Sequence, residues 1–216
     1  MESPENAEFV HVWEPPVTDD APVLLTLHGT GGDERDLLAL GRVLVPGAGL
    51  LSPRGNVIEG DGIPRFFRRI PTDTPGPYPF TFDDAEVAER AADLANWVAD
   101  VRADYDVADR RLLVTGFSNG ANMAAAMVMF QPGLFDAAVL FAPMPVLSSP
   151  PEGDLHGAAV WLGGGRRDPI ATPGQVEQLA GQLEERGADV TTDLFMAGHE
   201  VTREAIEAAH AWLKSQ

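Results

Sequence analysis

A serine flanked by glycines stands near the middle of the chain. Residues 116–120 read Gly-Phe-Ser-Asn-Gly and match the pattern G-x-S-x-G, which places a serine on a sharp turn between a strand and a helix. The apolar run 112–115 before it is typical of a buried strand, and residues 121–130 after it are rich in Ala and Met, as in a helix. Small residues on both sides of the turn expose the hydroxyl of Ser118. The pattern therefore predicts a nucleophile at Ser118, with an incidental serine in a glycine-rich turn as the alternative.

A serine nucleophile needs a histidine base and a carboxylate that orients it, and behind such a turn they follow in the order acid, then histidine. His199 directly follows the last predicted strand. The other histidines precede the serine, precede a strand or lie on a helix face expected to be solvated: His11, His28, His156 and His210. Asp168 follows the penultimate predicted strand, whereas the remaining candidates are placed less favourably: Asp136, Asp154, Asp189 and Asp193. Ser118, Asp168 and His199 are the predicted catalytic residues; a turn role for Asp168 and a helix-start role for His199 are the alternatives.

Such chemistry also needs two N–H donors for a developing oxyanion. One is predicted on Asn119, the residue after the serine. The other is predicted on Thr30, within the loop His-Gly-Thr-Gly-Gly at residues 28–32, which follows an apolar run. We expect His28 to shape this loop. The glycine pair at 31–32 also suits a flexible turn or a phosphate cradle, but no Lys-Ser/Thr follows as in a P-loop.

The elements that position these residues alternate between strand and helix. Strands are predicted over 9–13, 22–27, 48–52, 112–115, 137–141, 158–162 and 190–195, and helices over 34–44, 83–104, 121–130, 172–186 and 200–214. This order indicates an α/β domain spanning 1–216, with a mainly parallel sheet and helices on both faces. The three segments with candidate functional residues all follow strands, where sites on such sheets lie.

Two connections bear on substrate access. Residues 53–82 form a long Pro/Gly-rich region, in which Arg65, Phe66 and Phe67 either line a substrate pocket or belong to a loop anchored by two buried phenylalanines. Residues 143–157 are too short and too polar for an amphipathic lid. We therefore expect an open pocket over Ser118, walled mainly by residues 53–82.

Composition narrows the function further. The 33 acidic residues against 15 basic ones give a net charge of −18, which disfavours nucleic acid and anionic membranes as partners. This surface suits either solubility or a high-salt environment. The chain has no cysteine, so thiolate metal sites, disulfides and a cysteine nucleophile are excluded. No apolar run is long enough to span a membrane, and the acidic N-terminus does not read as a signal peptide, so we expect a cytoplasmic protein.

The chain resembles the phospholipase/carboxylesterase family of small α/β-hydrolases over nearly its whole length, from residues 27–29 through the serine turn to Asp168-Pro169 and Gly198-His199. Acyl-protein thioesterases of that family tend to carry Gln at the position of Asn119 and Leu at the position of Thr30. The chain is therefore more similar to the bacterial and archaeal branch. The resemblance implies an α/β-hydrolase fold and serine esterase or thioesterase activity with a Ser118–Asp168–His199 triad and no cofactor. Because the connection 143–157 is short, we expect a minimal, lidless form of this fold, and we expect no metal site.

The expected function is hydrolysis of small-molecule carboxylic esters of short to medium acyl chain through an acyl-enzyme. A thioesterase or lysophospholipase with the same triad is one alternative. A ligand-binding protein that keeps the scaffold without turnover is another, because fold does not fix function. A homodimer is compatible with the sequence, which leaves the oligomeric state open.

Overall fold

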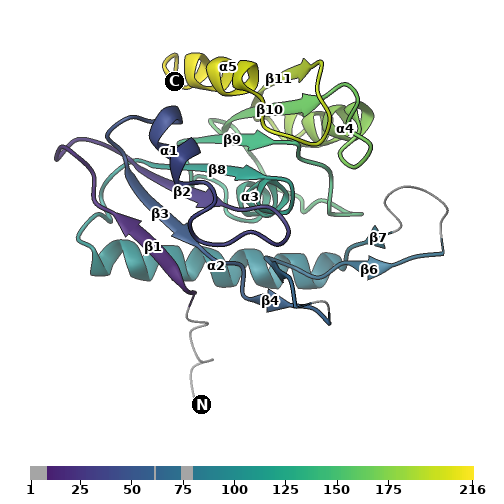
Figure 1. Cartoon of the computed structure of the whole chain (residues 1–216), viewed down its shortest axis with the longest axis horizontal. Coiled ribbons are helices and arrows are strands. Elements are labelled where there is room, and N and C mark those ends of the chain that lie inside the picture. Colours follow the sequence, from purple (N-terminus) through teal and green to yellow (C-terminus); the bar gives the residue numbers. More distant parts are fainter. Residues whose placement is uncertain (1–8, 61, 74–79) are drawn as a thin grey trace.

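The protein is built around a seven-stranded sheet with the strand order β1-β3-β2-β8-β9-β10-β11 (Figure 1). The computed structural model describes residues 9–60, 62–73 and 80–216. The strands of this sheet are β1 (His11–Glu14), β2 (Val23–Leu27), β3 (Gly49–Pro53), β8 (Leu112–Phe117), β9 (Ala137–Phe141), β10 (Ala159–Gly165) and β11 (Asp189–Phe195). All neighbours pair in parallel except β1, which lies antiparallel to β3 at the edge. This confirms the predicted α/β class.

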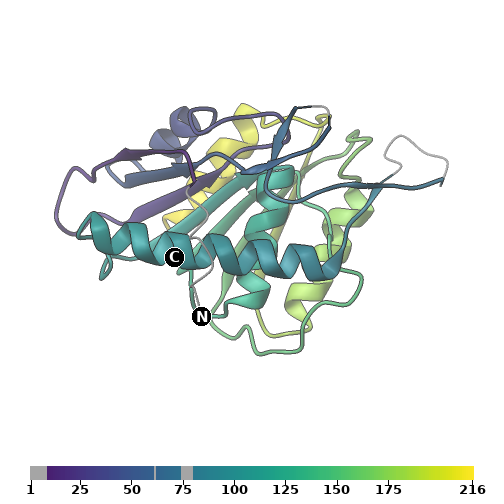
Figure 2. The same ribbon diagram turned by 90° about the horizontal axis from the view of Figure 1, so that it is seen from below.

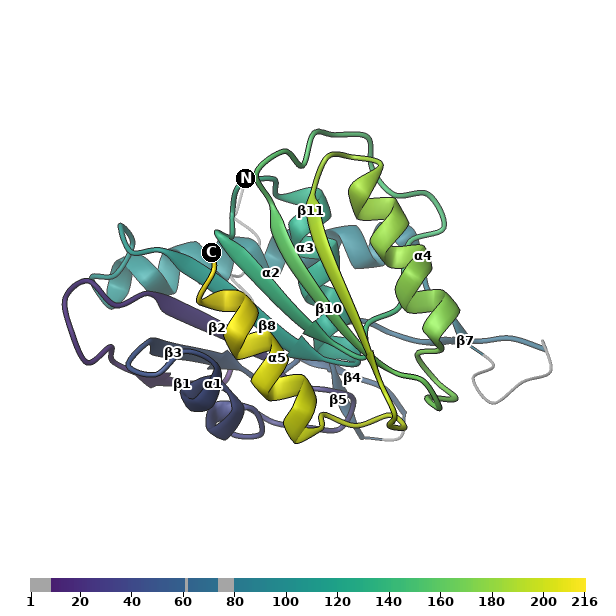
Figure 3. The same cartoon turned by 90° about the horizontal axis from the view of Figure 1, so that it is seen from above.

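Helices cover both faces of the sheet. The short α1 (Leu38–Leu44) and the C-terminal α5 (Arg203–Leu213) pack together on one face (Figure 3). The opposite face is covered by α2 (Asp84–Asp104), α3 (Asn119–Phe130) and α4 (Pro173–Glu184), and the long α2 crosses much of the view in Figure 2. Asp83 caps α2 by accepting hydrogen bonds from the N–H groups of residues 85 and 86, which explains the acidic start seen in the sequence.

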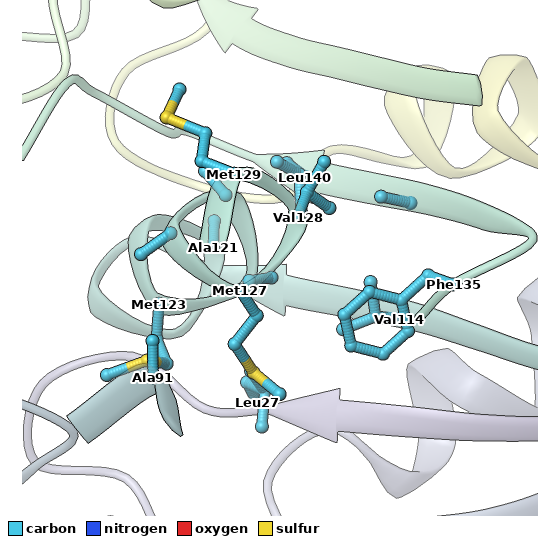
Figure 4. Close-up of a cluster of buried hydrophobic side chains, with 14 of the residues drawn as sticks. Leu27, Ala91, Val114, Ala121, Met123, Met127, Val128, Met129, Phe135 and Leu140 are labelled. Atoms are coloured by element: carbon cyan, nitrogen blue, oxygen red, sulfur yellow. The ribbon is translucent and has the colours of Figure 1, made fainter. Parts of the chain in front are cut away.

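The main core lies between the sheet and the second group of helices. The strands β2, β3 and β9 are buried at every residue, as continuous apolar runs predict for central strands. In Figure 4, Met123 and Met127 of α3 fill the space between α2 and the sheet, close to Ala91 and Leu27. The alanines of α3 are buried and small, so this helix packs close to the strands. The first turn of α3 therefore lies directly at the carboxyl end of β8.

The structure extends two predicted strands. The strand β8 continues to Phe117, directly before the serine. The strand β10 continues to Gly165 and includes three glycines that were predicted to form a loop, because they pair in register with residues 193–195 of β11. A Cβ on Gly163 would stand 2.3 Å from the Trp161 ring, so glycine leaves room for that ring without ending the strand. The helix α1 begins at Leu38, four residues later than predicted.

The long region 53–82 contains two short hairpins within its described part. They pair β4 (Val57–Ile58) with β5 (Pro64–Arg65), and β6 (Ile70–Pro71) with β7 (Phe80–Thr81). Residues 143–157 between β9 and β10 form neither helix nor strand, so no helical lid is inserted there. Across the described ranges, no helix has the length and apolar character needed to cross a membrane.

Candidate active site

Ser118 lies on a strained turn between β8 and α3. Its backbone has φ 51° and ψ −115°, a left-handed conformation that costs a non-glycine residue free energy. The turn is sharp enough to exclude side chains on both flanks. A Cβ on Gly116 would stand 2.6 Å from the backbone of Gly120, and a Cβ on Gly120 would stand 2.0 Å from the carbonyl oxygen of Leu27. Backbone atoms cannot move aside cheaply, so both glycines are required by the geometry.

The three predicted catalytic side chains form one hydrogen-bonded chain. His199 Nε2 lies 2.9 Å from Ser118 Oγ, and His199 Nδ1 lies 2.7 Å from Asp168 Oδ2. When Nδ1 carries the imidazole proton and donates a hydrogen bond to the carboxylate, Nε2 is unprotonated and can accept the hydroxyl proton of the serine. The Asp168 side chain is fully buried, and the His199 side chain is 19% exposed. The arrangement can therefore deprotonate Ser118 while the histidine stays within reach of a substrate.

Asp168 is held rigidly at the end of β10. Its Oδ1 accepts hydrogen bonds from the N–H groups of Ile170, at 2.8 Å, and Ala171, at 3.0 Å, which leaves Oδ2 for the histidine. The histidine loop packs against this turn, because Arg167 N–H donates to the Ala197 carbonyl at 2.9 Å. A Cβ on Gly165 would stand 2.2 Å from the carbonyl oxygen of Gly198, so glycine permits this close approach.

The two predicted oxyanion donors lie on adjacent segments. The strand β2 pairs with β8, with Leu27 opposite Gly116, so the loop of residues 28–32 emerges beside the serine turn. Asn119 is the first residue of α3, where a backbone N–H has no intrahelical acceptor. Thr30 belongs to the loop, which is tied down by a hydrogen bond from Gly31 N–H to the Pro64 carbonyl. The arrangement brings both segments to the serine; the oxyanion role of Thr30 and Asn119 stays a prediction.

His28 is buried beneath the loop. Its Nε2 accepts a hydrogen bond from Gly55 N–H at 2.8 Å, so the proton is on Nδ1, which donates to the Gly29 carbonyl at 2.6 Å. Burial lowers the pKa of His28 and outweighs the Gly29 carbonyl and the nearby Asp36 and Asp33, which raise it. A neutral His28 therefore joins the loop to residue 55, in agreement with the structural role that we expected.

Two asparagines of α3 were not predicted to hold the surroundings of the serine. The side chain of Asn119 accepts a hydrogen bond from Phe66 N–H at 2.8 Å, and that of Asn122 accepts one from Met144 N–H at 2.9 Å. Both side chains are buried. Their spacing of three residues along one helix face was the available signal. They fix the segments on either side of the helix that begins after Ser118.

The segment of residues 65–67 is a buried anchor. The relative exposure of Arg65, Phe66 and Phe67 is 0%, 2% and 0%, and the guanidinium of Arg65 pairs with Glu59 at 2.7 Å. Phe66 packs against His28, and Phe67 against Phe82. This corresponds to the second interpretation of the segment, a loop anchored by two phenylalanines. The prediction of substrate contacts for these three residues gains no support, because their side chains have little surface to offer.

An open cavity of about 380 Å³ begins next to Asp168, at Pro169 and Ile170. Ser118, Asp168 and His199 are themselves not among its described lining residues. Its described walls come from residues 80–84, 144–148 and 169–178. The last two segments adjoin the site: residue 169 follows Asp168, and residue 144 follows β9, whose Phe141 carbonyl accepts the N–H of Ser118 at 2.9 Å. Residues 144–148 and 169–178 supply most of the described walls, and the prediction that residues 53–82 are the main wall of a pocket over Ser118 stays a prediction, since Ser118 does not line this cavity. Residues 53–82 contribute Phe80, Thr81 and Phe82 to it, because most of that region is used in anchoring contacts and hairpins.

One other histidine differs from expectation. His210 was predicted to be solvated, but it is partly buried and its Nδ1 donates to the Leu44 carbonyl at 2.8 Å. It therefore links α5 to the end of α1 on the face away from α3.

Within residues 9–60, 62–73 and 80–216, no group of three or more His, Asp or Glu side chains is arranged to hold a metal ion.

Comparison with known proteins agrees with this architecture. The model of the dienelactone hydrolase family matches residues 79–213. MhqD of Bacillus subtilis strain 168, a protein named as a hydrolase, is 34% identical over 204 residues, which cover 94% of this chain and 97% of MhqD. A carboxylesterase from Bacillus cereus superposes with a TM-score of 0.88 at 33% identity, covering 98% of this chain and 99% of that one. A carboxylesterase from Mesorhizobium loti superposes with a TM-score of 0.79 at 28% identity, covering 90% and 89%.

The family match extends over more than half of the chain, from the end of the hairpin region through the serine turn, the aspartate and the histidine. MhqD and the Bacillus cereus carboxylesterase match nearly all of this chain, so the similarity also includes the part of the sheet that precedes the family match. The chain therefore belongs to the dienelactone hydrolase family and is an α/β-hydrolase of the phospholipase/carboxylesterase type.

Proposed function

We propose that this hydrolase is a serine carboxylesterase that works through an acyl-enzyme at Ser118. The observation that supports it most is the hydrogen-bonded chain from Asp168 through His199 to the Ser118 hydroxyl. The relatives that are carboxylesterases support the same class of reaction. A protein that only binds ligands has no need of a strained serine paired with an oriented base.

The mechanism follows from the geometry. His199 Nε2 takes the proton of Ser118 as its oxygen attacks the ester carbonyl, and the N–H groups of Thr30 and Asn119 stabilise the oxyanion. The resulting imidazolium is stabilised by Asp168 and returns the proton to the departing alcohol. Water then attacks the acyl-enzyme with His199 again as the base, which releases the carboxylic acid and restores the serine.

The proposed substrates are neutral esters with acyl chains of short to medium length. An open cavity of about 380 Å³ is at the small end of ligand sites and does not form a long apolar tunnel. The same chemistry also cleaves thioesters, so the leaving group is a separate question. A panel of matched esters and thioesters, each at several acyl lengths, assigns the preference.

Steady-state kinetics with p-nitrophenyl acetate and butyrate test the proposal. We expect turnover by the wild-type chain, a loss on the order of 10⁴-fold or more in Ser118→Ala, and a strong fall of kcat in Asp168→Asn with the fold intact. Circular dichroism and thermal melts establish that both variants are folded. Turnover that survives in folded Ser118→Ala would contradict the proposal.

A further inference from the structure

The walls of the cavity beside Asp168 are fixed before any substrate arrives. Asn122 holds Met144 N–H at one end of the wall formed by residues 144–148. At the other end, the carboxylate of Asp84 accepts hydrogen bonds from Ser148 N–H at 2.9 Å, Ser148 Oγ at 2.8 Å and Ser149 N–H at 2.9 Å. A wall tied at both ends loses little conformational entropy on binding, as expected of a pre-formed ligand site.

The lining of the cavity suits an uncharged group. Phe80, Phe82, Val146 and Leu147 supply apolar surface. Among the described residues that line it, Asp84 is the only charged one, and its carboxylate is already bonded to the serines. Burial would raise the pKa of Asp84, but these hydrogen bonds outweigh it and hold the pKa below its usual value. A fixed negative charge in the wall, within a chain of net charge −18, disfavours a substrate group that is itself an anion.

Two amide side chains line the cavity, those of Gln175 and Gln178, and Gln175 is the one whose orientation is fixed by hydrogen bonds. Gln175, near the start of α4, lines the cavity, and its Oε1 accepts hydrogen bonds from Thr172 N–H at 3.0 Å and Thr172 Oγ at 2.9 Å. These two donors fix which end of the amide is oxygen and which is nitrogen. The Nε2 group then has only the Met144 sulfur, at 3.9 Å, as its hydrogen-bond partner among the described residues. Thioether sulfur is a weak acceptor, so an oxygen atom would be a better partner for this donor.

We propose that this cavity is the specificity site for the acid or alcohol part of the substrate and that it selects a neutral group with an oxygen acceptor, to which Gln175 Nε2 donates. The substrate class is therefore esters with a keto, ether or second ester oxygen a few bonds from the scissile carbonyl. Plain hydrocarbon chains of equal size bind less well because they leave the Gln175 donor on its sulfur. The inference rests on the proposed serine esterase activity.

The experiment compares matched esters that differ in one group, either in the acyl part or in the alcohol part. On the acyl side, p-nitrophenyl hexanoate, 5-oxohexanoate and hydrogen glutarate present a similar length with an ethyl, a ketone or a carboxylate end, after subtraction of uncatalysed hydrolysis. On the alcohol side, 4-ethylphenyl and 4-methoxyphenyl acetate differ by a methylene against an oxygen. We expect kcat/KM to favour the oxygen-bearing neutral ester about fivefold in one of the two series, as for one net hydrogen bond. We expect the glutarate to be poorer than the ketone by at least about tenfold.

The variant Gln175→Glu isolates the donor. A glutamate keeps an oxygen for Thr172 N–H, as capping boxes commonly do, so the start of α4 is preserved, but the N–H donor of residue 175 is removed from the cavity. The preference for the oxygen-bearing ester over its hydrocarbon partner should disappear or reverse. The matched control is Gln131→Glu, which makes the same change of charge at the far end of α3 from Ser118 and should keep the wild-type preference.

The outcomes separate this inference from the function on which it rests. Hydrolysis of p-nitrophenyl acetate that depends on Ser118, with no preference in either matched series, would overturn the cavity assignment and leave the esterase proposal standing. A preference that persists unchanged in Gln175→Glu would also overturn it, as would a wild-type preference for the glutarate. A complete lack of Ser118-dependent hydrolysis would instead remove the esterase proposal itself.

Discussion

Gly120 touches the backbone of Leu27, since a Cβ on Gly120 would stand 2.0 Å from the carbonyl oxygen of that residue. This contact joins the first turn of α3 to the end of β2. The loop that includes Thr30 begins directly after β2, and Asn119 precedes Gly120. The two segments with predicted oxyanion donors are thus locked together by a contact that only glycine permits.

The first prediction concerns this contact. Gly120→Ala should lower the free energy of unfolding by roughly 3 kcal/mol, because backbone must move to admit the methyl group. It should also reduce kcat by displacing the donors. Gly181→Ala is the matched control: this glycine is inside α4, has nothing within 4 Å of its added Cβ, and should gain about 0.5–1 kcal/mol. Denaturant unfolding measures both; equal effects of the two substitutions would contradict the packing argument.

A second prediction follows from buried His28, whose folded pKa lies below the ordinary value of 6.5. The unfolded chain then binds more protons than the folded chain between the two pKa values. The stability that His28 contributes is therefore fully present above pH 6.5 and is lost as pH falls through the folded pKa. Between neutral and mildly acidic pH, Tm should fall more steeply for the wild type than for His28→Gln.

The control for this comparison is Asn56→Gln, because residue 56 is exposed, follows the hydrogen-bonded Gly55 and loses no titratable group in this substitution. Its curve of Tm against pH should run parallel to that of the wild type. Parallel curves for His28→Gln and the wild type would show that other groups cause the acid sensitivity.

The fold was largely predictable from the sequence, and the arrangement of the site only in part. Apolar runs and glycine positions predicted the strands, and the rule that sites follow strand ends selected Asp168 and His199 from several candidates. The structure brings these two residues and Ser118 together; their catalytic roles stay predictions. The three-glycine end of β10 was missed because glycine is usually a turn signal, whereas here it admits the Trp161 ring and the Gly198 backbone.

The cavity could not be predicted, because its walls depend on contacts between segments that are distant in the chain. Asp84 reaches Ser148 across 64 residues, and Asn122 reaches Met144 across 22. No local pattern marks a side chain as a partner for a loop so far away. The Arg65–Phe67 segment misled for a related reason: aromatic and basic residues in a long loop suit either a pocket or an anchor, and only burial separates the two.

A third prediction concerns the net charge of −18. Acidic groups repel one another at low ionic strength, and at molar salt that repulsion is screened within about 3 Å. Tm should therefore climb with KCl more steeply than for a near-neutral protein of this size. A flat response from low to molar KCl would favour the simpler interpretation, in which the acidic residues serve solubility.

The fourth prediction concerns acyl length. Each added methylene group contributes about 0.8 kcal/mol of binding free energy only while it is buried against an apolar wall. The cavity has a volume of about 380 Å³, which limits how many such groups can be buried. For p-nitrophenyl esters, kcat/KM should rise over short chains, peak at short to medium length and fall for long ones. Because residues 143–157 contain no helical lid, rates should not jump at the solubility limit of the substrate. A steady preference for palmitate, or such a jump, would contradict this account.

The most direct test of the central claim is covalent labelling with a fluorophosphonate, followed by mass spectrometry of the digested chain. The hydrogen bond of 2.9 Å between His199 Nε2 and Ser118 Oγ predicts a single adduct on Ser118, with hydrolysis of p-nitrophenyl acetate lost in proportion to labelling. His199→Ala should slow the labelling by orders of magnitude. An adduct on another residue, or an unlabelled Ser118 in a chain that still turns over esters, would contradict the assignment of Ser118 as the nucleophile.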